Sequence, residues 1–162
     1  MTQTTSPSTG AAEHDDPLRD ALQAFEKTLA TPVVEGEMAE WGRAMQQAWE
    51  EAAKCIRASV DVAHRKQMKE IAEADPEMYK RVEQIDAEDR EIRRLLDNQA
   101  SDIPRVIRNL PIAERDPAAL VNEELESLVN DGLAFVSRVR KQEVVVQTWL
   151  LEAFNRERGD GD

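Results

Sequence analysis

The sequence is poor in the residue types that build disulfides, metal clusters and sheets. Its 162 residues include one cysteine, two histidines and six glycines, and only 4% are aromatic. The single cysteine, Cys55, excludes an internal disulfide, and two histidines are too few for a Cys/His zinc cluster. The small number of histidines also disfavours a Ser-His-Asp catalytic arrangement, because one of the two, His14, lies in the N-terminal segment. Cys55 falls within an apolar helical pattern, so we expect a small core residue in a reducing compartment.

Positive charge is scarce as well. The chain has 33 acidic and 21 basic residues, which gives a formal net charge of −12. Nucleic acids and anionic membranes attract basic surfaces, so this charge argues against both as ligands. The uncharged, mainly apolar stretch at residues 144–151 is too short to span a bilayer, and residues 1–16 lack the apolar run of a signal peptide. We therefore expect a cytoplasmic protein, and a basic surface on any protein partner.

The remaining composition is typical of helices. Hydrophobic residues make up 41%, near the globular average, and Ala, Leu, Glu and Arg are abundant. Residues 1–15 are rich in Ser and Thr and are predicted to be a disordered tail. Residues 16–158 form one predicted domain, and residues 159–162 are expected to fray. The predicted fold class is all-α, an up-down four-helix bundle with one short and three long helices.

Three Asp-Pro pairs mark predicted helix starts, because Asp is a favoured N-cap and Pro fits the first helical position. The pairs are Asp16-Pro17, Asp75-Pro76 and Asp116-Pro117. The short helix should end near Thr31, and a second helix should run from about residue 35 or 37 to about 72. Residues 101–116 contain Pro104 and Pro111 and are expected to be a long connection. In the last helix, Gly132 should mark a kink or a close helix contact.

Three polar residues interrupt the apolar stripes of the long helices. His64 follows Ile56 and Val60 at intervals of four, Asp89 lies between Ile85 and Ile92, and Gln142 lies between Val139 and Val146. Three interpretations stay open for them. They could lie at the edge of the stripe in contact with water, form a buried and mutually satisfied polar cluster, or form a metal or catalytic site with Glu88 or Glu143 turning inward. A buried neutral His64 would destabilise the fold at acid pH.

One segment resembles the central part of the hemerythrin-like (HHE) cation-binding family. The segment is "HRKQMKEIAEADPEMYKRVEQIDAEDREIRRLLD", residues 64–97, and in it Glu88-Asp89 stands where the family has Glu-His. The end of the chain, "QEVVVQTWLLEAFNRERGDGD", is similar to the family's closing pattern. The resemblance covers roughly residues 17–162. It implies a four-helix bundle in which histidines and bridging carboxylates hold two irons.

Carried over position by position, the resemblance leaves one ligand, His64. Met68 and Val146 replace glutamates, whereas Asp89 and Gln142 replace histidines, and Leu22 or Ala21 replaces another histidine. The resemblance therefore implies a degenerate site with no metal and no cofactor, at positions His64, Met68, Asp89, Gln142, Val146 and Leu22.

The leading functional hypothesis is a non-catalytic binding or structural module that has lost the di-iron site. Two alternatives stay open. The first is a self-associating protein, such as a homodimer, in which Trp or Val surface left uncovered by the short helix is buried. The second is a metal-binding or oxygen- or redox-sensing protein with an atypical site. Most of the three tryptophans, Trp41, Trp49 and Trp149, should anchor the core.

Overall fold

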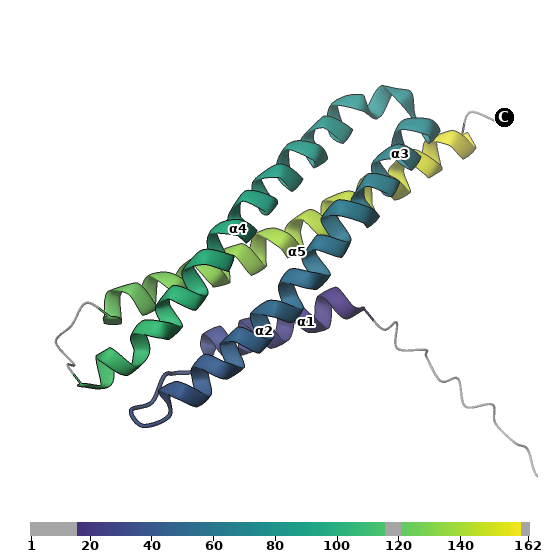
Figure 1. Cartoon of the computed structure of the whole chain (residues 1–162). Coiled ribbons are helices and arrows are strands. Elements are labelled where there is room, and N and C mark those ends of the chain that lie inside the picture. The colour runs from purple at the N-terminus through teal and green to yellow at the C-terminus, as the bar shows by residue number, and fades with distance from the viewer. Residues whose placement is uncertain (1–15, 116–120, 160–162) are drawn as a thin grey trace, which may run out of the picture.

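The computed structural model describes residues 16–115 and 121–159, and every regular element in that part of the chain is helical (Figure 1). The prediction of a disordered tail at residues 1–15 falls outside the described residues, as does the helix start at 116–117. The all-α, four-helix prediction is confirmed. The elements are α1 (Pro17–Ala30), α2 (Met38–Ala58), the π-helical turn η1 (Ser59–Ala63), α3 (His64–Ala74), the 3-10 turn η2 (Pro76–Met78), α4 (Tyr79–Arg115) and α5 (Val121–Gly159).

Two predicted N-caps are confirmed in atomic detail. The Asp16 carboxylate accepts a hydrogen bond from the backbone N–H of Arg19 at 3.1 Å, and Asp75 accepts one from the N–H of Glu77 at 3.0 Å. Each bond satisfies one of the N–H groups that a helix start leaves without an intrahelical partner. The two Asp-Pro pairs therefore set where α1 and η2 begin.

The second long helix is continuous from residue 38 to residue 74 but changes its winding at η1. The backbone N–H of His64 donates to the carbonyl of Ser59, five residues earlier, which is the π pattern. The sequence analysis did not anticipate this turn. The wider turn holds one extra residue, so Ser59, Val60 and His64 are all buried on the inner side of the helix.

The prediction of a connection at residues 101–116 is wrong. α4 continues as a helix through Pro104 and Pro111 to Arg115. Proline inside a helix costs about 3 kcal/mol, because it lacks the N–H and crowds the preceding turn. Beyond Leu96, however, the apolar stripe continues with three large buried side chains, each worth roughly 1.5–3 kcal/mol. Together they outweigh the cost of Pro104; they are Ile103, Val106 and Leu110.

α5 is uninterrupted at Gly132. Of the two expected outcomes, a kink or a close helix contact, the structure has the close contact. A Cβ added at this position would lie 2.8 Å from Cδ1 of Leu29 on α1, closer than carbon atoms can approach. The missing side chain therefore lets α1 lie tightly against α5. An ion pair between Glu26 and Arg140, with N and O 2.7 Å apart, joins the same two helices.

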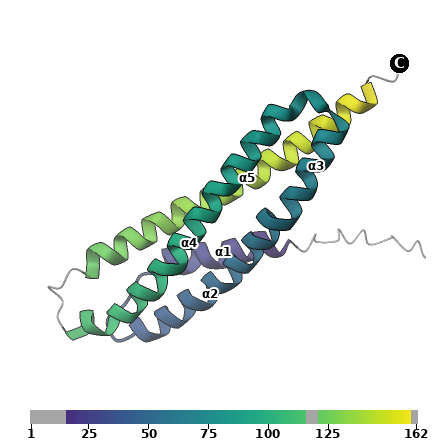
Figure 2. The same cartoon turned by 45° about the horizontal axis from the view of Figure 1, so that its top comes forward.

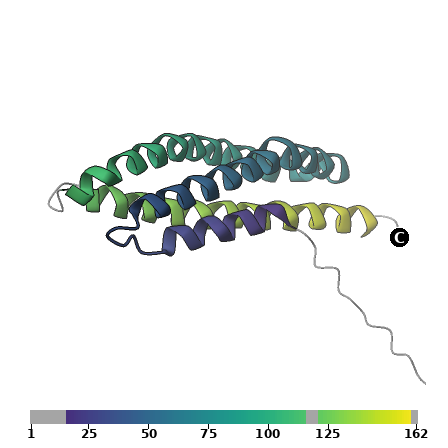
Figure 3. The same cartoon turned by 60° about the horizontal axis from the view of Figure 1, so that its bottom comes forward.

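The short helix covers only part of the bundle. Figure 3 shows α1 beside α5 in one layer, with α2, α3 and α4 in the other. α1 packs against α2 and α5, whereas α3 packs directly against α5 (Figure 2). The described part of the bundle therefore contains four helices over the length of α1 and three helices beyond it.

Among the residues whose side chains the structure describes, the buried apolar side chains form two separate clusters. We call the first the four-helix core, because α1, α2, α4 and α5 all contribute to it. Its centre holds Trp49, whose ring lies 5.4 Å from that of Phe25 and 6.2 Å from that of Phe135, centroid to centroid. We call the second the three-helix core; it consists of Ile71, Met78, Ile85, Val146 and Ala153.

The tryptophan prediction is confirmed. Trp41 and Trp49 are buried in the four-helix core, and the indole N–H of Trp41 donates to the carbonyl of Thr31 at 3.2 Å. Trp149 is half-buried against the three-helix core. Cys55 is half-buried rather than fully buried. No helix in the described ranges has a stretch both long and apolar enough to cross a membrane.

Candidate functional site

The three polar residues that interrupt the apolar stripes meet inside the bundle. His64 and Asp89 are fully buried and Gln142 is 4% exposed, so the interpretation that placed them at the edge in contact with water is wrong. The His64 Nδ1 lies 2.9 Å from Asp89 Oδ1, and the Gln142 amide donates to the same oxygen at 2.8 Å. The Gln142 amide also lies 3.2 Å from the carbonyl of Ile85. A buried, mutually hydrogen-bonded cluster is therefore what the structure contains, and we call these three residues the polar layer.

The polar layer separates the two apolar cores. On each long helix the residue on one side of the layer belongs to the four-helix core; these residues are Val60, Ile92 and Val139. On the other side, Ile85 and Val146 belong to the three-helix core and Met68 packs against it. The layer thus lies near the level where α1 stops covering the bundle.

Two further side chains complete the contacts of His64. Its Nε2 lies 2.7 Å from Oε1 of Glu143 and 3.2 Å from Oγ of Ser59, and Ser59 donates to the same glutamate oxygen at 2.5 Å. The sequence suggested that Glu88 or Glu143 could turn inward to a metal or catalytic site. Glu143 does reach His64. Glu88 instead pairs with Arg138 across the surface of α4 and α5.

Ser59 reaches His64 because of the π-helical turn. In an α-helix, residues five apart do not face the same way, whereas the i to i+5 bonding of a π turn brings them together. Arg93 of α4 supports this turn from outside: its Nε donates to Asp61 at 2.7 Å and its terminal nitrogen to the carbonyl of Val60 at 3.4 Å. No sequence signal marked Ser59, because the π turn itself was not predictable from the apolar spacing.

His64 is held in its charged form. Burial by itself would lower its pKa, but the hydrogen bonds to Asp89 and Glu143 outweigh that effect and raise the pKa to about 9. Both ring nitrogens then carry protons, and each donates to a carboxylate. The expectation that acid destabilises the fold assumed a neutral buried histidine. Because the two carboxylates raise the pKa of His64, its contribution to stability is instead lost as the pH rises.

The remaining positions carried over from the resemblance are apolar and packed. Leu22 is buried in the four-helix core, Val146 is fully buried in the three-helix core, and Met68 is half-buried against that core. The structure therefore brings His64, Asp89 and Gln142 together, places Met68 and Val146 in the neighbouring apolar core, and places Leu22 in the core on the opposite side of the layer. Among the residues of ranges 16–115 and 121–159, no three His, Cys, Asp or Glu side chains gather as a metal site requires.

Ser59, His64 and Asp89 lie in the order of a serine-hydrolase triad, an arrangement that the count of histidines had disfavoured. The order alone does not supply the chemistry. A triad needs an imidazole that accepts a proton from the serine, and the charged His64 has no lone pair to accept it. Ser59 is also 8% exposed, and its hydroxyl is already donated to Glu143. The cluster is therefore built as a set of satisfied hydrogen bonds.

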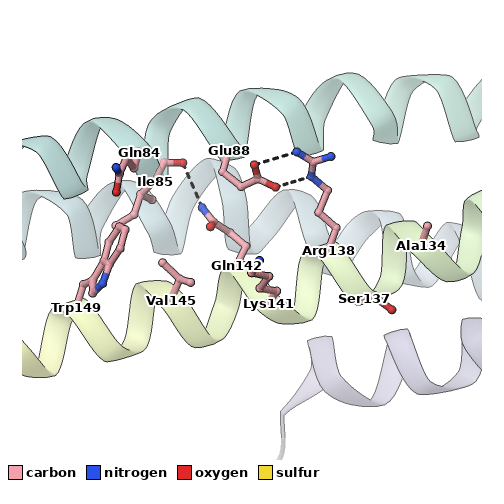
Figure 4. Close-up of a pocket in the computed structure, with 10 residues that line it drawn as sticks. All are labelled: Gln84, Ile85, Glu88, Ala134, Ser137, Arg138, Lys141, Gln142, Val145 and Trp149. Atoms are coloured by element: carbon pink, nitrogen blue, oxygen red, sulfur yellow. Dashed lines mark hydrogen bonds and ion pairs between the residues drawn. The ribbon is translucent and has the colours of Figure 1, made fainter.

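A groove of about 550 Å³ runs beside the polar layer between α4 and α5 (Figure 4). Gln142 lines it, whereas Ser59 and His64 do not. The ion pair of Arg138 with Glu88 lies along the groove, and Trp149 lies at the end nearer Gln84 (Figure 4). Gln142 is thus the only residue of the polar layer that borders this groove.

Comparisons with known proteins bring no further information on the site, because no protein-family model, no curated protein and no solved structure matches the chain.

Proposed function

We propose that this chain is a hemerythrin-like helical bundle that has lost its di-iron site and acts as a non-catalytic protein-interaction or structural module. The observation that carries the proposal is the state of His64. Both of its nitrogens are engaged, by Asp89 at 2.9 Å and by Glu143 at 2.7 Å. A metal ligand needs a free nitrogen lone pair, so the position that the resemblance assigns to a ligand is occupied by two hydrogen bonds.

The apolar replacements support the same proposal. Met68 and Val146 stand where the resemblance implies carboxylates, and each packs against or within the three-helix core. Apolar volume in place of charge closes a metal cavity and removes the groups that would hold the ion. The non-catalytic part of the proposal rests on the charged imidazole, which has no lone pair with which to act as a general base near neutral pH.

The proposed partner is a protein with a basic surface, and the proposed location is the cytoplasm. A formal net charge of −12 steers basic surfaces towards the chain and repels nucleic acids. The lone, half-buried Cys55 is consistent with a reducing compartment.

Metal content measured by elemental analysis, on protein expressed with iron supplied, tests the loss of the site. We expect iron, manganese and zinc far below one equivalent and no absorption band from an iron centre. A stoichiometric metal content that survives a chelator would overturn the proposal. A variant carrying Met68→Glu, Asp89→His, Gln142→His and Val146→Glu tests the resemblance itself. If the positions correspond to the family's ligands, this variant gains metal that the parent chain lacks.

Exposed apolar residues on α5 favour self-association as a second candidate. Val144 and Leu151 are 66% and 63% exposed, and their spacing of seven places them on one face of the helix, beside the partly exposed Phe154. Light scattering with gel filtration tests this candidate. A dimer that Leu151→Gln disrupts and Val34→Gln does not would support it, because Val34 is similarly exposed but lies before α2. A monomer at high concentration would exclude it.

A further inference from the structure

The Gln142 side chain has one hydrogen-bonding atom that the polar layer does not use. Its amide nitrogen donates to Asp89 at 2.8 Å and to the carbonyl of Ile85 at 3.2 Å, and these two acceptors fix which end of the carboxamide is the nitrogen. No side chain or N–H in the described ranges donates to Gln142 Oε1. The one buried side-chain polar atom there that is both unpaired and closed off from solvent is Gln99 Oε1, so Gln142 Oε1 keeps accessible surface.

This accessible oxygen belongs to a residue that is otherwise buried. Gln142 is only 4% exposed, and it lines the groove of about 550 Å³ between α4 and α5. The free acceptor therefore opens into the groove. Buried polar side chains are normally hydrogen-bonded, so a molecule that occupies the groove gains by bringing a donor to this atom.

The walls of the groove fit a flat molecule of modest size. Three residues of α5 follow one another at intervals of four along it: Lys141, Val145 and Trp149. At a rise of 1.5 Å per residue, Lys141 and Trp149 lie about 12 Å apart along the helix. Figure 4 shows Trp149 towards one end of the groove and Gln142 near its middle. The volume of the groove lies within the roughly 300–1,000 Å³ that is typical of small-molecule sites.

Trp149 provides aromatic surface at its end of the groove. The ring is half-buried, and the guanidinium of Arg81 lies 5.6 Å from the ring centre, where an ion pair with Glu152 holds it. Val145 and Ile85 add aliphatic surface beside the ring. Aromatic rings pair favourably with one another at 4.5–7 Å between centroids, so this end of the groove favours an aromatic ligand.

The groove has an excess of positive charge in a strongly acidic chain. Its charged lining residues are Glu88, Arg138 and Lys141. Arg138 and Glu88 form an ion pair, which leaves the exposed ammonium group of Lys141 uncompensated among the lining residues. The formal net charge of the whole chain is −12, so this groove differs in sign from the molecule around it. Its charge favours an anion.

We propose that this groove binds a small aromatic carboxylate that carries a ring N–H. The ring packs against Trp149 and Val145, the N–H donates to Gln142 Oε1, and the carboxylate pairs with Lys141. The inference goes beyond the proposed function, because it assigns a small-molecule ligand to a bundle proposed as an interaction or structural module. Gln142 also donates to Asp89, so the ligand is connected to the polar layer through one side chain.

Nuclear magnetic resonance of isotopically labelled protein tests the inference at the level of single residues. The probe is indole-3-acetate, an aromatic carboxylate with a ring N–H. A ligand of this size binds with a dissociation constant on the order of 1 mM or below, so the titration extends to about 10 mM. Salt at about 0.15 M screens the net charge of the chain. We expect saturable shifts of the Trp149 indole N–H and of the Gln142 side-chain amide.

The other two tryptophans are internal references for this titration. Trp41 and Trp49 are buried in the four-helix core, so their indole signals should not move. The spectrum of Trp149→Phe identifies the Trp149 signal by its loss. Shifts of equal size at all three indoles would mean that the probe binds elsewhere or perturbs the whole fold, and this would overturn the inference.

Two analogues of the probe test the donor and the charge separately. The N-methyl derivative lacks the ring N–H and should bind about fivefold more weakly, the scale of one hydrogen bond, with a smaller shift at the Gln142 amide. The neutral amide of the same acid lacks the carboxylate and should bind roughly two- to fivefold more weakly, the scale of an exposed ion pair. Equal affinities for the probe and both analogues would contradict the proposed contacts.

A matched pair of charge variants provides the control on the protein side. Lys141→Gln and Lys54→Gln each remove one positive charge from an exposed lysine, but only Lys141 lines the groove. Lys141→Gln should weaken indole-3-acetate binding by the factor that separates the acid from its amide, and should leave the affinity for the amide unchanged. Lys54→Gln should change neither affinity. Because both lysines are exposed, both variants should keep the circular dichroism spectrum and the denaturation midpoint of the parent chain.

Two results would overturn the inference directly. The first is the absence of saturable shifts at Trp149 and Gln142 at the highest probe concentration. The second is an equal loss of affinity in the two lysine variants, because the probe then responds to net charge alone. Neither result bears on metal content or on a protein partner, so the proposed function stands or falls by its own experiments.

Discussion

His64 and Asp89 form a hydrogen-bonded ion pair, with Nδ1 2.9 Å from Oδ1, and both residues are fully buried. The pair links α3 to α4, and Gln142 and Glu143 extend it to α5. Because the layer joins all three long helices at one level, it fixes their register with respect to one another. Its stability effects are therefore measurable without knowledge of any ligand.

Removing one member of this pair should be strongly destabilising. Asp89→Leu leaves a charged imidazole beside only Glu143, and we expect a loss of about 3–5 kcal/mol in the free energy of unfolding. Urea denaturation measures it. The double variant His64→Leu with Asp89→Leu should be less destabilised than the sum of the two single variants, because it leaves no unpaired buried charge. Additive losses would show that the pair is not coupled.

The raised pKa of His64 makes stability depend on pH in a defined window. The folded pKa is about 9 and the usual value is 6.5, so the folded state binds the proton more tightly. The resulting stabilisation is fully present below pH 6.5 and is lost as the pH rises through 9. Its size is on the order of 3 kcal/mol, and it appears in urea denaturation measured at a series of pH values.

His64→Gln supplies the control for this titration. The variant removes the titrating group, so its stability should change little between pH 6.5 and 9. Cys55 does not interfere at the lower end, because burial raises the pKa of its thiol above the usual value. An equal slope in the parent chain and in His64→Gln would contradict the assignment to His64.

Gly132→Ala should destabilise the contact between α1 and α5. Alanine favours a helix over glycine by about 1 kcal/mol, but its Cβ would lie 2.8 Å from Leu29 Cδ1, and overpacking of this kind costs about 1–3 kcal/mol. We expect the overpacking to prevail in thermal or urea denaturation. Leu29→Ala in the same chain should remove the clash, so the second substitution should cost less in Gly132→Ala than in the parent chain.

Pro104→Ala should stabilise the protein without changing its helix content. α4 is already helical through this position, so the substitution restores the N–H that bonds the carbonyl of Ala100. The gain of about 3 kcal/mol is offset by about 1 kcal/mol from the freer unfolded chain. We expect a net increase of about 2 kcal/mol in the free energy of unfolding by urea, with an unchanged far-ultraviolet circular dichroism spectrum. A loss of stability would mean that the ring of Pro104 contributes more by packing than its missing N–H costs.

Local chemistry made much of the fold predictable. Asp16 and Asp75 cap their helices through bonds to residues two or three positions away, so the sequence pairs were sufficient to place those starts. The interruption of the apolar stripes at His64, Asp89 and Gln142 was also visible in the spacing, because the helical period places each of them on a core-facing side. Which side chains would satisfy them was only partly visible, through Asp89 and Gln142.

The tertiary structure decided what depends on neighbours distant in the sequence. Apolar packing against α2 and α5 carries α4 through Pro104, where the local rule predicts a break. The π-helical turn aligns Ser59 with His64, and Glu143 reaches the imidazole from the facing helix. The charge of His64 follows from burial and from carboxylates on other helices. The sequence by itself thus determined the helices and their inward faces, because these arise from local bonding and periodicity. Contacts between helices determined the protonation of His64 and the satisfied hydrogen bonds of the polar layer.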